Sequence, residues 1–285
     1  MYPFNDQVFI IAELSANHNN DFDLAVDTIK AMAKAGANAV KVQTYTADSL
    51  AINVDNDIFG KRKEGLWKGR TLWDLYKEAS MPYEWHEPLQ KVAQELGLVF
   101  FSSPFDVDGV AFLEQLNVPL YKIASFEITD IPLIRAVAKT GKPIIISTGV
   151  AQEADISLAL ETCHRENNHQ VTLLKCTSNY PSTLADANLK TMADMRARFD
   201  VTVGVSDHTM GSIVPITATA LGARVIEKHF ILDRSLGGPD SAFSMEPREF
   251  SDMVESVRQV EQTLGKVTYA VSEKDKLRRR SLYAS

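Results

Sequence analysis

Short apolar runs alternate with longer amphipathic segments along almost the whole chain. The short runs are rich in Val, Ile and Phe and are bounded by Gly, Pro or polar residues. Runs of this kind are typical of buried β-strands. The pattern predicts eight strands, at residues 8–14, 39–45, 98–104, 120–126, 143–148, 170–177, 201–207 and 224–230.

The amphipathic segments predict a helix between successive strands and one after the last. Their apolar residues recur at helical spacing, and several segments end at a glycine, a common helix C-terminal signal. The predicted helices span residues 23–35, 83–96, 108–116, 132–140, 153–166, 189–199, 213–221 and 247–264. Residues 46–80 break the rhythm as a long polar insertion after the second strand. An insertion of that length in a compact domain is usually functional.

Eight strand–helix units predict an α/β fold, the TIM (β/α)8 barrel. Alternating strands and helices imply a parallel sheet, and eight units in about 250 residues match the size of this barrel. The alternative is an open doubly wound sheet, which usually has fewer strands and often a GxGxxG motif that is missing after the first strand. All eight predicted strands end in polar residues. Because barrel active sites lie at the C-terminal ends of the strands, we expect the active site there.

Composition narrows the class of protein. The 285 residues are 45% hydrophobic and carry a formal net charge of −7, with both signs interspersed. This balance argues against a surface for nucleic acid or anionic membrane. Cys163 and Cys176 lie in no metal-binding or redox spacing, and neither a signal peptide nor a window of ~20 apolar residues is visible. We therefore expect a cytoplasmic protein with reduced thiols.

Two histidines end neighbouring strands, His208 in VGVSDHT and His229 in EKHF. Each could be an ordinary hydrogen-bonded histidine. Together they could place two neutral imidazoles beside one pocket, with Asp207 and Glu227 close enough to orient the rings. Two nitrogen ligands with open positions suit a divalent cation that also binds water or a substrate oxygen. We expect a metal site at this point.

Lysines and serines form a second group at the strand ends. Lys41 and Lys122 lie within predicted strands, where a buried ammonium is costly unless it is paired. With the neighbouring hydroxyls they could hold a phosphate or carboxylate, although a single serine at a strand end is more often a turn residue. A barrel lysine can also form a Schiff base, and the sequence leaves that reading open. The serines are Ser103, Ser125, Ser147, Ser178 and Ser206.

Carboxylates form a third group in the same region. In a pocket that holds cations, one or two of them could act as general acid or base. They could equally form ion pairs with the two lysines, and spacing does not rank them. They are Glu13, Glu127, Asp207, Glu227 and Asp240.

Several motifs in this chain are specific enough to be recognised. They are IIAELSANHN (10–19), GANAVKVQTY (36–45), FSSPFD (101–106), YKIASFEITD (121–130), GKPIIISTG (141–149), LLKCTSNYP (173–181), VGVSDHT (203–209), EKHF (227–230) and GGPDSAFS (237–244). Over essentially the whole barrel they resemble the sialic acid synthase family of phosphoenolpyruvate-dependent condensing enzymes. ELSANHN, SFEITD, CTSNYP and the insertion LWKGRTLWDLYKEA are most similar to the branch of this family that makes pseudaminic acid.

The resemblance implies a transferase that forms a C–C bond between phosphoenolpyruvate and the open-chain aldehyde of an acetamido sugar, releasing phosphate. The sugar expected for this branch is 2,4-diacetamido-2,4,6-trideoxy-altrose. The implied cofactor is Mn²⁺ or Mg²⁺, held by His208 and His229, which would polarise the aldehyde oxygen. The residues that match phosphoenolpyruvate-binding positions are Lys41, Lys122, Ser103, Ser125, Ser147, Ser178 and Ser206. Those that match sugar-binding positions are Gln43, Tyr180 and Asp240, and Glu127 and Glu13 match catalytic ones.

The chain departs from the family pattern at three points. Asn20 replaces a common glycine, and Ser178 replaces the asparagine of sialic acid synthases, which fits the pseudaminic branch. The family also carries a small antifreeze-like (SAF) domain after the barrel, which donates an arginine to the partner's sugar site in a domain-swapped homodimer. We therefore expect a catalytic barrel over residues 1–265, truncated before that domain, and a linker toward it over residues 266–285.

Three other functions are left open by the sequence. The enzyme could use the sugar of an N-acetylneuraminate or legionaminate synthase. It could be a Schiff-base aldolase on the same barrel. It could also bind its ligands without turnover in the absence of the last domain.

Overall fold

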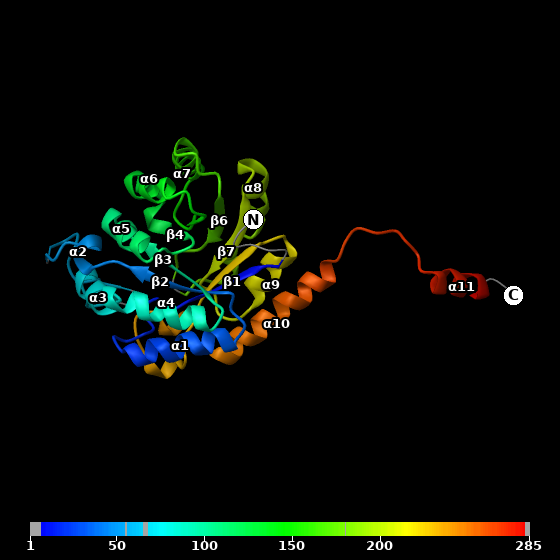
Figure 1. Cartoon of the computed structure of the whole chain (residues 1–285), viewed down its shortest axis with the longest axis horizontal. Helices are drawn as coiled ribbons and strands as arrows, with labels where there is room; N and C mark the ends of the chain where they lie inside the picture. Colours follow the sequence, from blue (N-terminus) through cyan, green and yellow to red (C-terminus); the bar gives the residue numbers. More distant parts are fainter. Residues whose placement is uncertain (1–6, 55, 65–67, 180, 283–285) are drawn as a thin grey trace.

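The computed structural model describes residues 7–54, 56–64, 68–179 and 181–282. Eight parallel strands follow one another around a closed barrel, and the last pairs with the first. The predicted TIM barrel is therefore confirmed (Figure 1). The strands are β1 (Phe9–Glu13), β2 (Ala39–Thr44), β3 (Val99–Pro104), β4 (Tyr121–Ile123), β5 (Ile144–Ser147), β6 (Val171–Cys176), β7 (Thr202–Asp207) and β8 (Val225–His229).

Helices cover the outside of the barrel, as the amphipathic segments predict. Several begin at an acidic side chain that accepts a hydrogen bond from the first helical turn, as Asp21, Asp106 and Asp130 do. The helices are α1 (Phe22–Lys34), α4 (His86–Glu95), α5 (Val107–Gln115), α6 (Ile131–Lys139), α7 (Glu153–Arg165), α8 (Lys190–Phe199), α9 (Ile213–Ala220) and α10 (Pro247–Leu264). Short 3-10 turns are η1 (Tyr83–Trp85), η2 (Ser125–Thr129), η3 (Leu184–Ala187), η4 (Arg234–Leu236) and η5 (Ser241–Phe243).

The insertion after the second strand has more structure than its polar sequence indicates. It contains two helices, α2 (Ala47–Leu50) and α3 (Leu72–Ala79). The indole of Trp73 donates a hydrogen bond to Asp48, which joins them. Only two residues of α3 are buried, Leu75 and Ala79, so its apolar stripe is too narrow to stand out in the sequence.

The fourth strand is shorter than predicted. The run 120–126 is a strand only as far as Ile123, and Ser125 and Glu127 lie in the 3-10 turn η2 that follows. The amide of Glu127 donates to the carbonyl of Ala124, and Asp130 then caps α6. The chain must turn this early because α6 begins only a few residues later. Both side chains therefore project from a loop above the barrel.

Two apolar clusters are separated by the strands. The larger one packs the helices onto the barrel, whereas the smaller one fills the barrel's lower interior. The interior cluster includes Ile11, Ala39 and Phe101. Since side chains alternate along a strand, the next inward positions are those of Glu13, Lys41 and Ser103, two residues further along each strand. The interior thus changes from apolar to polar toward the C-terminal ends.

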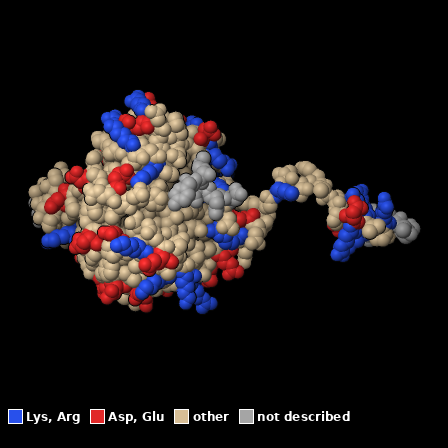
Figure 2. Space-filling view, viewed as in Figure 1, with Lys and Arg blue, Asp and Glu red and all other residues tan. Residues whose placement is uncertain are grey.

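The chain after the barrel leads away from it. α10 ends at Leu264, a stretch without regular structure follows, and α11 (Glu273–Leu282) lies apart from the barrel (Figure 1). The boundary at residue 265 and the role of 266–285 as a linker stay predictions. Figure 2 shows acidic and basic side chains interspersed on the visible face of the barrel. In the described part of the chain no helix is long and apolar enough to cross a membrane.

Candidate active site

The predicted site residues gather at the C-terminal mouth of the barrel. Some end strands and point inward, and the others lie in the loops that follow. Tyr180 lies outside the described residues. The strand residues are Glu13, Lys41, Gln43, Ser103, Lys122, Ser147, Ser206, Glu227 and His229, and the loop residues are Ser125, Glu127, Ser178, His208 and Asp240.

Two lysines and two glutamates form a buried charge network at the base of the mouth. The Lys41 ammonium lies 2.6 Å from the Glu13 carboxylate and 3.7 Å from that of Glu227. The Lys122 ammonium lies 3.8 Å from Glu227. Both lysines and both carboxylates are buried, so each charge depends on its neighbours instead of on water. The pairing that the sequence left open is present.

The network separates the protonation behaviour of its two carboxyls. Burial raises the pKa of Glu13 to about 7, although Lys41 opposes this. Burial would also raise the pKa of Glu227, but Lys122 and Lys41 outweigh it and lower that pKa. Glu13 is therefore the member that can hold or release a proton near neutral pH, while Glu227 stays ionised. Environments that push two carboxyls apart in this way are common in active sites.

The pKa values of the two lysines are shifted in opposite directions. Burial alone would lower the pKa of Lys41, but Glu13 and Glu227 outweigh it and raise that pKa. For Lys122 burial prevails and the pKa is lowered. A lysine needs a depressed pKa to act as an amine nucleophile. Lys41 is thus held as an ammonium, whereas Lys122 keeps the Schiff-base alternative open.

Two serines and a cysteine lie close to Gly149, which follows β5. Its amide donates a hydrogen bond of 3.1 Å to Ser125 Oγ. A Cβ at Gly149 would lie 2.3 Å from Ser178 Oγ and 2.8 Å from Ser125 Oγ, so only a glycine lets these hydroxyls approach so closely. Among the described residues, the buried hydroxyls of Ser147 and Ser178 have no hydrogen-bond partner. Buried hydroxyls that have no partner in the protein suit an anionic ligand, to which they could donate.

The other two predicted hydroxyls bind the charge network. Lys41 Nζ donates a 3.4 Å hydrogen bond to Ser103 Oγ, and Ser206 Oγ donates to Glu227 at 2.8 Å. Ser103 thus contacts a lysine of the network and Ser206 a carboxylate. The arrangement can hold an anion that reaches from the charge network to Gly149.

The two predicted metal-binding histidines face each other. Their ring centroids lie 5.2 Å apart, and the ring of Phe243 packs edge-on against both. His208 Nδ1 lies 2.8 Å from the carbonyl oxygen of Thr177. A carbonyl only accepts, so in the neutral ring Nδ1 carries the proton and Nε2 carries the lone pair.

The pair fits a cation that has two protein ligands. The buried Nδ1 of His229 makes no hydrogen bond within the described residues and lies 3.9 Å from Asp240. Burial, and next the nearby His208, lowers the pKa of His229 well below its usual value, so its ring is neutral, the form that binds metals. The described residues contain no group of three or more His, Cys, Asp or Glu suited to a metal ion. Water and substrate would fill the remaining positions.

The expected orientation of these rings by acidic neighbours is wrong. Asp207 forms an ion pair of 2.5 Å with Lys228, and Glu227 binds Ser206 and lies near the two interior lysines. Asp207 turns away from the barrel interior because its neighbour Ser206 points inward and side chains alternate along a strand. For His208 the orienting group is instead the carbonyl of Thr177, which the sequence did not indicate.

A second residue that the sequence did not indicate joins the predicted sugar-binding side chains. Ser15 donates a hydrogen bond to the Asp240 carboxylate and accepts one of 3.1 Å from Gln43 Nε2. Gln43 also donates to Glu13 at 3.2 Å. Ser15 has φ 46°, a left-handed conformation that is uncommon outside glycine and worth noting at a functional site. Nothing in the local sequence marks it.

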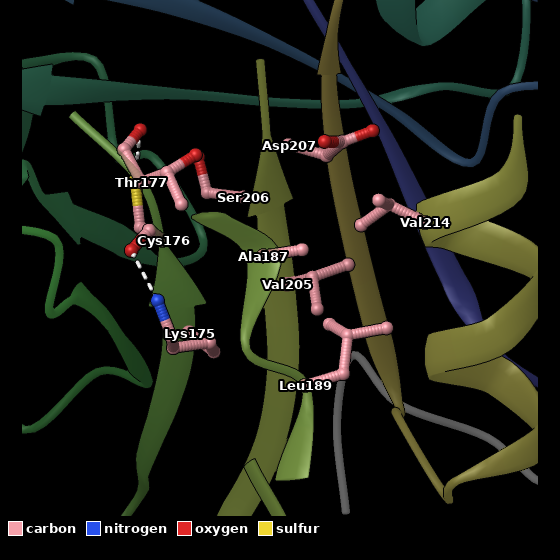
Figure 3. A pocket seen from close by; sticks show the side chains of 9 residues that line it. All are labelled: Lys175, Cys176, Thr177, Ala187, Leu189, Val205, Ser206, Asp207 and Val214. Carbon is pink, nitrogen blue, oxygen red and sulfur yellow. Dashed lines mark hydrogen bonds between the residues drawn. The ribbon is translucent and has the colours of Figure 1, made fainter. Parts of the chain in front are cut away.

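A further pocket lies at β6 and β7 beside η3 and α9 (Figure 3). Lys175 in its wall donates a 2.9 Å hydrogen bond to the carbonyl of Cys176, and Asp207 lies near Val214 on the α9 side. The histidine pair and the lysine–glutamate network do not line this pocket. Its lining residues are Lys175, Cys176, Thr177, Ala187, Leu189, Val205, Ser206, Asp207 and Val214.

Several known proteins are similar to this chain in sequence and in fold. The model of the NeuB family matches residues 28–269. A pseudaminic acid synthase of Campylobacter jejuni is 48% identical over 282 residues, which is 98% of this chain and 82% of that protein. An N,N'-diacetyllegionaminic acid synthase of Legionella pneumophila is 40% identical over 261 residues, 90% of this chain and 73% of that one. The crystal structure of an N-acetylneuraminic acid synthetase from Leptospira borgpetersenii in complex with citrate has a TM-score of 0.85 at 32% identity, covering 98% of this chain and 92% of that chain.

Proposed function

The chain belongs to the NeuB family, and we propose that it condenses phosphoenolpyruvate with 2,4-diacetamido-2,4,6-trideoxy-altrose to give pseudaminic acid and phosphate. C3 of phosphoenolpyruvate bonds to the aldehyde carbon, water adds at C2, and the C–O bond to phosphate breaks. The observation that carries the choice of product is the 48% identity to a pseudaminic acid synthase over nearly the full chain.

The interior cations and the serine cluster would hold phosphoenolpyruvate. Lys41 and Lys122 supply positive charge where water is excluded, and charge-assisted hydrogen bonds are strong there. Ser147 and Ser178 have buried hydroxyls without partners in the described structure, and the lack of a side chain at Gly149 leaves room for the hydroxyls of Ser178 and Ser125. The anion would thus be held between fixed donors, which orients its C3 toward the opposite side of the mouth.

The histidine pair would lie beside the sugar aldehyde. His208 and His229 would hold Mn²⁺ or Mg²⁺, which supplies Lewis-acid polarisation of a carbonyl oxygen. Thr177 fixes the tautomer of His208, and Asp240 lies beside His229. Asp240 and Gln43, linked by Ser15, would bind sugar hydroxyl or acetamido groups. Tyr180 is proposed for the same role from the family pattern.

Two carboxyls can move protons in this reaction. Burial raises the pKa of Glu127 to about 7, and its buried Oε2 has no hydrogen-bond partner among the described residues. Glu13 has a pKa raised to about 7 by burial as well. A group whose pKa lies near the working pH can both give and take a proton. We assign Glu127 to the developing charge near the sugar and Glu13 to the phosphoenolpyruvate side.

Two other candidates are each favoured by one observation. Legionaminate synthesis is favoured by the 40% identity to the Legionella protein. A Schiff-base aldolase is favoured by the lowered pKa of Lys122. Borohydride reduction in the presence of pyruvate separates the mechanisms. The proposal predicts no covalent adduct on Lys122 or Lys41 and loss of activity in EDTA; an adduct together with EDTA-resistant activity supports the aldolase.

A further inference from the structure

A buried ion pair lies directly behind the histidine pair. The ammonium of Lys228 in β8 lies 2.5 Å from the carboxylate of Asp207 in β7, and the two side chains are 0% and 1% exposed. The two residues are register partners on adjacent strands. Each precedes a histidine, since Asp207 is followed by His208 and Lys228 by His229. The pair points away from the barrel interior, and the rings point into it.

The same pair fixes the backbone on both sides of His208. Lys228 Nζ donates a second hydrogen bond, also 2.5 Å, to the carbonyl of Thr209. Asp207 accepts from the Thr209 amide at 3.0 Å and from its hydroxyl at 3.1 Å. The carbonyl of His208 itself accepts from the amide of Ser182. One ammonium therefore links the strand end that carries His229 to the turn that carries His208.

A buried ion pair is weak evidence for stability. Removing both charges from water is expensive, and a well-packed apolar pair of the same volume is often as stable or more stable. The contacts of Lys228 suggest another benefit, because its ammonium donates hydrogen bonds to Asp207 and Thr209, on either side of His208. Outer groups that fix the ligands of a metal usually change its affinity when they are altered.

We propose that Lys228, through Asp207 and Thr209, is a positioning residue that sets the separation and orientation of His208 and His229. The inference rests on the proposed function for its link to metal binding, although the ring geometry can be tested without any metal. Lys228 touches neither substrate nor cation in this account. Its effect passes through the backbone of residues 207–209 and the end of β8.

The first test is Mn²⁺ binding to the metal-free protein, followed by electron paramagnetic resonance. Lys228→Met is expected to weaken the Kd by at least about tenfold, within the range usual for outer partners of metal ligands. It will also lower Tm, because it leaves Asp207 buried without its partner. The double variant Asp207→Asn/Lys228→Met removes that charge and is expected to recover much of the Tm but not the affinity. Recovery of both together would make the pair merely structural and overturn the proposal.

Asn168→Ala is a matched control for destabilisation. Asn168 is buried and donates to the carbonyls of Ala138 and Lys142, close to the start of β6 and far from the mouth. This variant is expected to lower Tm while leaving the Mn²⁺ Kd within about twofold of the parent. A loss of affinity as large as that of Lys228→Met would mean that any destabilisation weakens the site, and the proposal would be wrong.

The second readout is the imidazole ¹⁵N spectrum of the metal-free protein. Lys228→Met is expected to shift the signals of His208 and His229 and to leave those of the exposed His164 and His169 in place. If the parent protein binds no Mn²⁺, the metal role in the proposed function fails, and these shifts still decide the positioning role. Unchanged signals from His208 and His229 would overturn the inference whether or not metal binds.

Discussion

The ammonium of Lys41 lies 2.6 Å from the carboxylate of Glu13, and the two side chains are 5% and 1% exposed. The contact joins β1 to β2 in register and closes one side of the charge network. In such a pair the cost of taking the charges from water is large, so removing one partner is worse than removing both.

Lys41→Met is expected to destabilise the fold by about 3–5 kcal/mol at pH 8, because it leaves Glu13 buried without its cation. The pKa of Glu13 is raised by burial already and would rise further without Lys41. A carboxyl with a raised pKa contributes stability at low pH that disappears as the pH rises through that pKa. The destabilisation caused by Lys41→Met should therefore be smaller at pH 6 than at pH 8. Urea unfolding at both values measures this.

Two controls accompany that measurement. Lys91→Met removes an exposed ion pair with Glu87 and should change stability by less than about 1 kcal/mol. Glu13→Gln/Lys41→Met should recover most of the loss. Equal stabilities for the single and double variants at pH 8 would show that Glu13 is not held as an anion by Lys41.

Gly149→Ala tests the proposed phosphoenolpyruvate site. The new Cβ would lie 2.3 Å from Ser178 Oγ and so displace that hydroxyl from its position. The expected result is a KM for phosphoenolpyruvate raised by about tenfold or more, consistent with the loss of one or two hydrogen bonds to a charged group. The KM for the sugar should change little, and steady-state phosphate release gives both values.

Gly109→Ala in α5 is the control for that substitution. A Cβ there would have its nearest neighbour at 3.2 Å, from the Asp106 side chain, and the residue lies outside the proposed site. Its KM for phosphoenolpyruvate should stay within about twofold of the parent value. An unchanged KM in Gly149→Ala would place the anion elsewhere.

His208→Ala and His229→Ala test the proposed metal site. Each should abolish Mn²⁺-dependent turnover and weaken Mn²⁺ binding by more than about tenfold, since one of two protein ligands is removed. The far-ultraviolet circular dichroism of both should match the parent, because the barrel does not depend on these rings. His169→Ala, at an exposed position, should leave activity and binding unchanged. Full metal-dependent activity in either site variant would contradict the assignment.

Glu127→Gln tests the raised pKa of Glu127. Burial raises that pKa from its ordinary 4.5 to about 7, so the folded state holds this proton more tightly than the unfolded state. The contribution of the Glu127 carboxyl to stability is present below about pH 4.5 and is lost as the pH rises through about 7. Glutamine cannot ionise, so the variant should gain stability relative to the parent between pH 5 and pH 8, on the order of 1–3 kcal/mol. Urea midpoints at the two pH values provide the comparison, and the same difference at both would refute the shift.

The alternation of side chains explains how much of this site could be predicted. Polar residues at strand ends, placed on a barrel, predict a polar C-terminal mouth, and the structure places Glu13, Lys41 and Ser103 there with their side chains inward. The same alternation places the side chain of Asp207 on the outside of the barrel, because Ser206 points inward. The prediction that Asp207 orients a histidine ring was wrong for this reason. The apolar run around Lys122 does not indicate that β4 ends as early as Ile123. That end is set by the turn η2, which depends on where α6 begins.

Other features depend on contacts that no local pattern shows. Ser15, after β1, is linked to Asp240 in the loop after the neighbouring β8, and the carbonyl of Thr177 contacts His208 from a neighbouring strand end. Backbone groups carry no sequence identity, so their role in orienting a ring is visible only in the fold. Family resemblance predicts the site residues, whereas their pairing is visible only in the structure.

The most direct test of the proposed function is phosphate release with a panel of sugars. The purified protein would be mixed with phosphoenolpyruvate, Mn²⁺ and, in turn, 2,4-diacetamido-2,4,6-trideoxy-altrose, the legionaminic acid precursor or N-acetylmannosamine, with the product identified by mass spectrometry. The proposal predicts phosphate and pseudaminic acid in equal amounts with the altrose and much slower release with the other two. Preferential turnover of either other sugar, or no phosphate release with any of them, would contradict it.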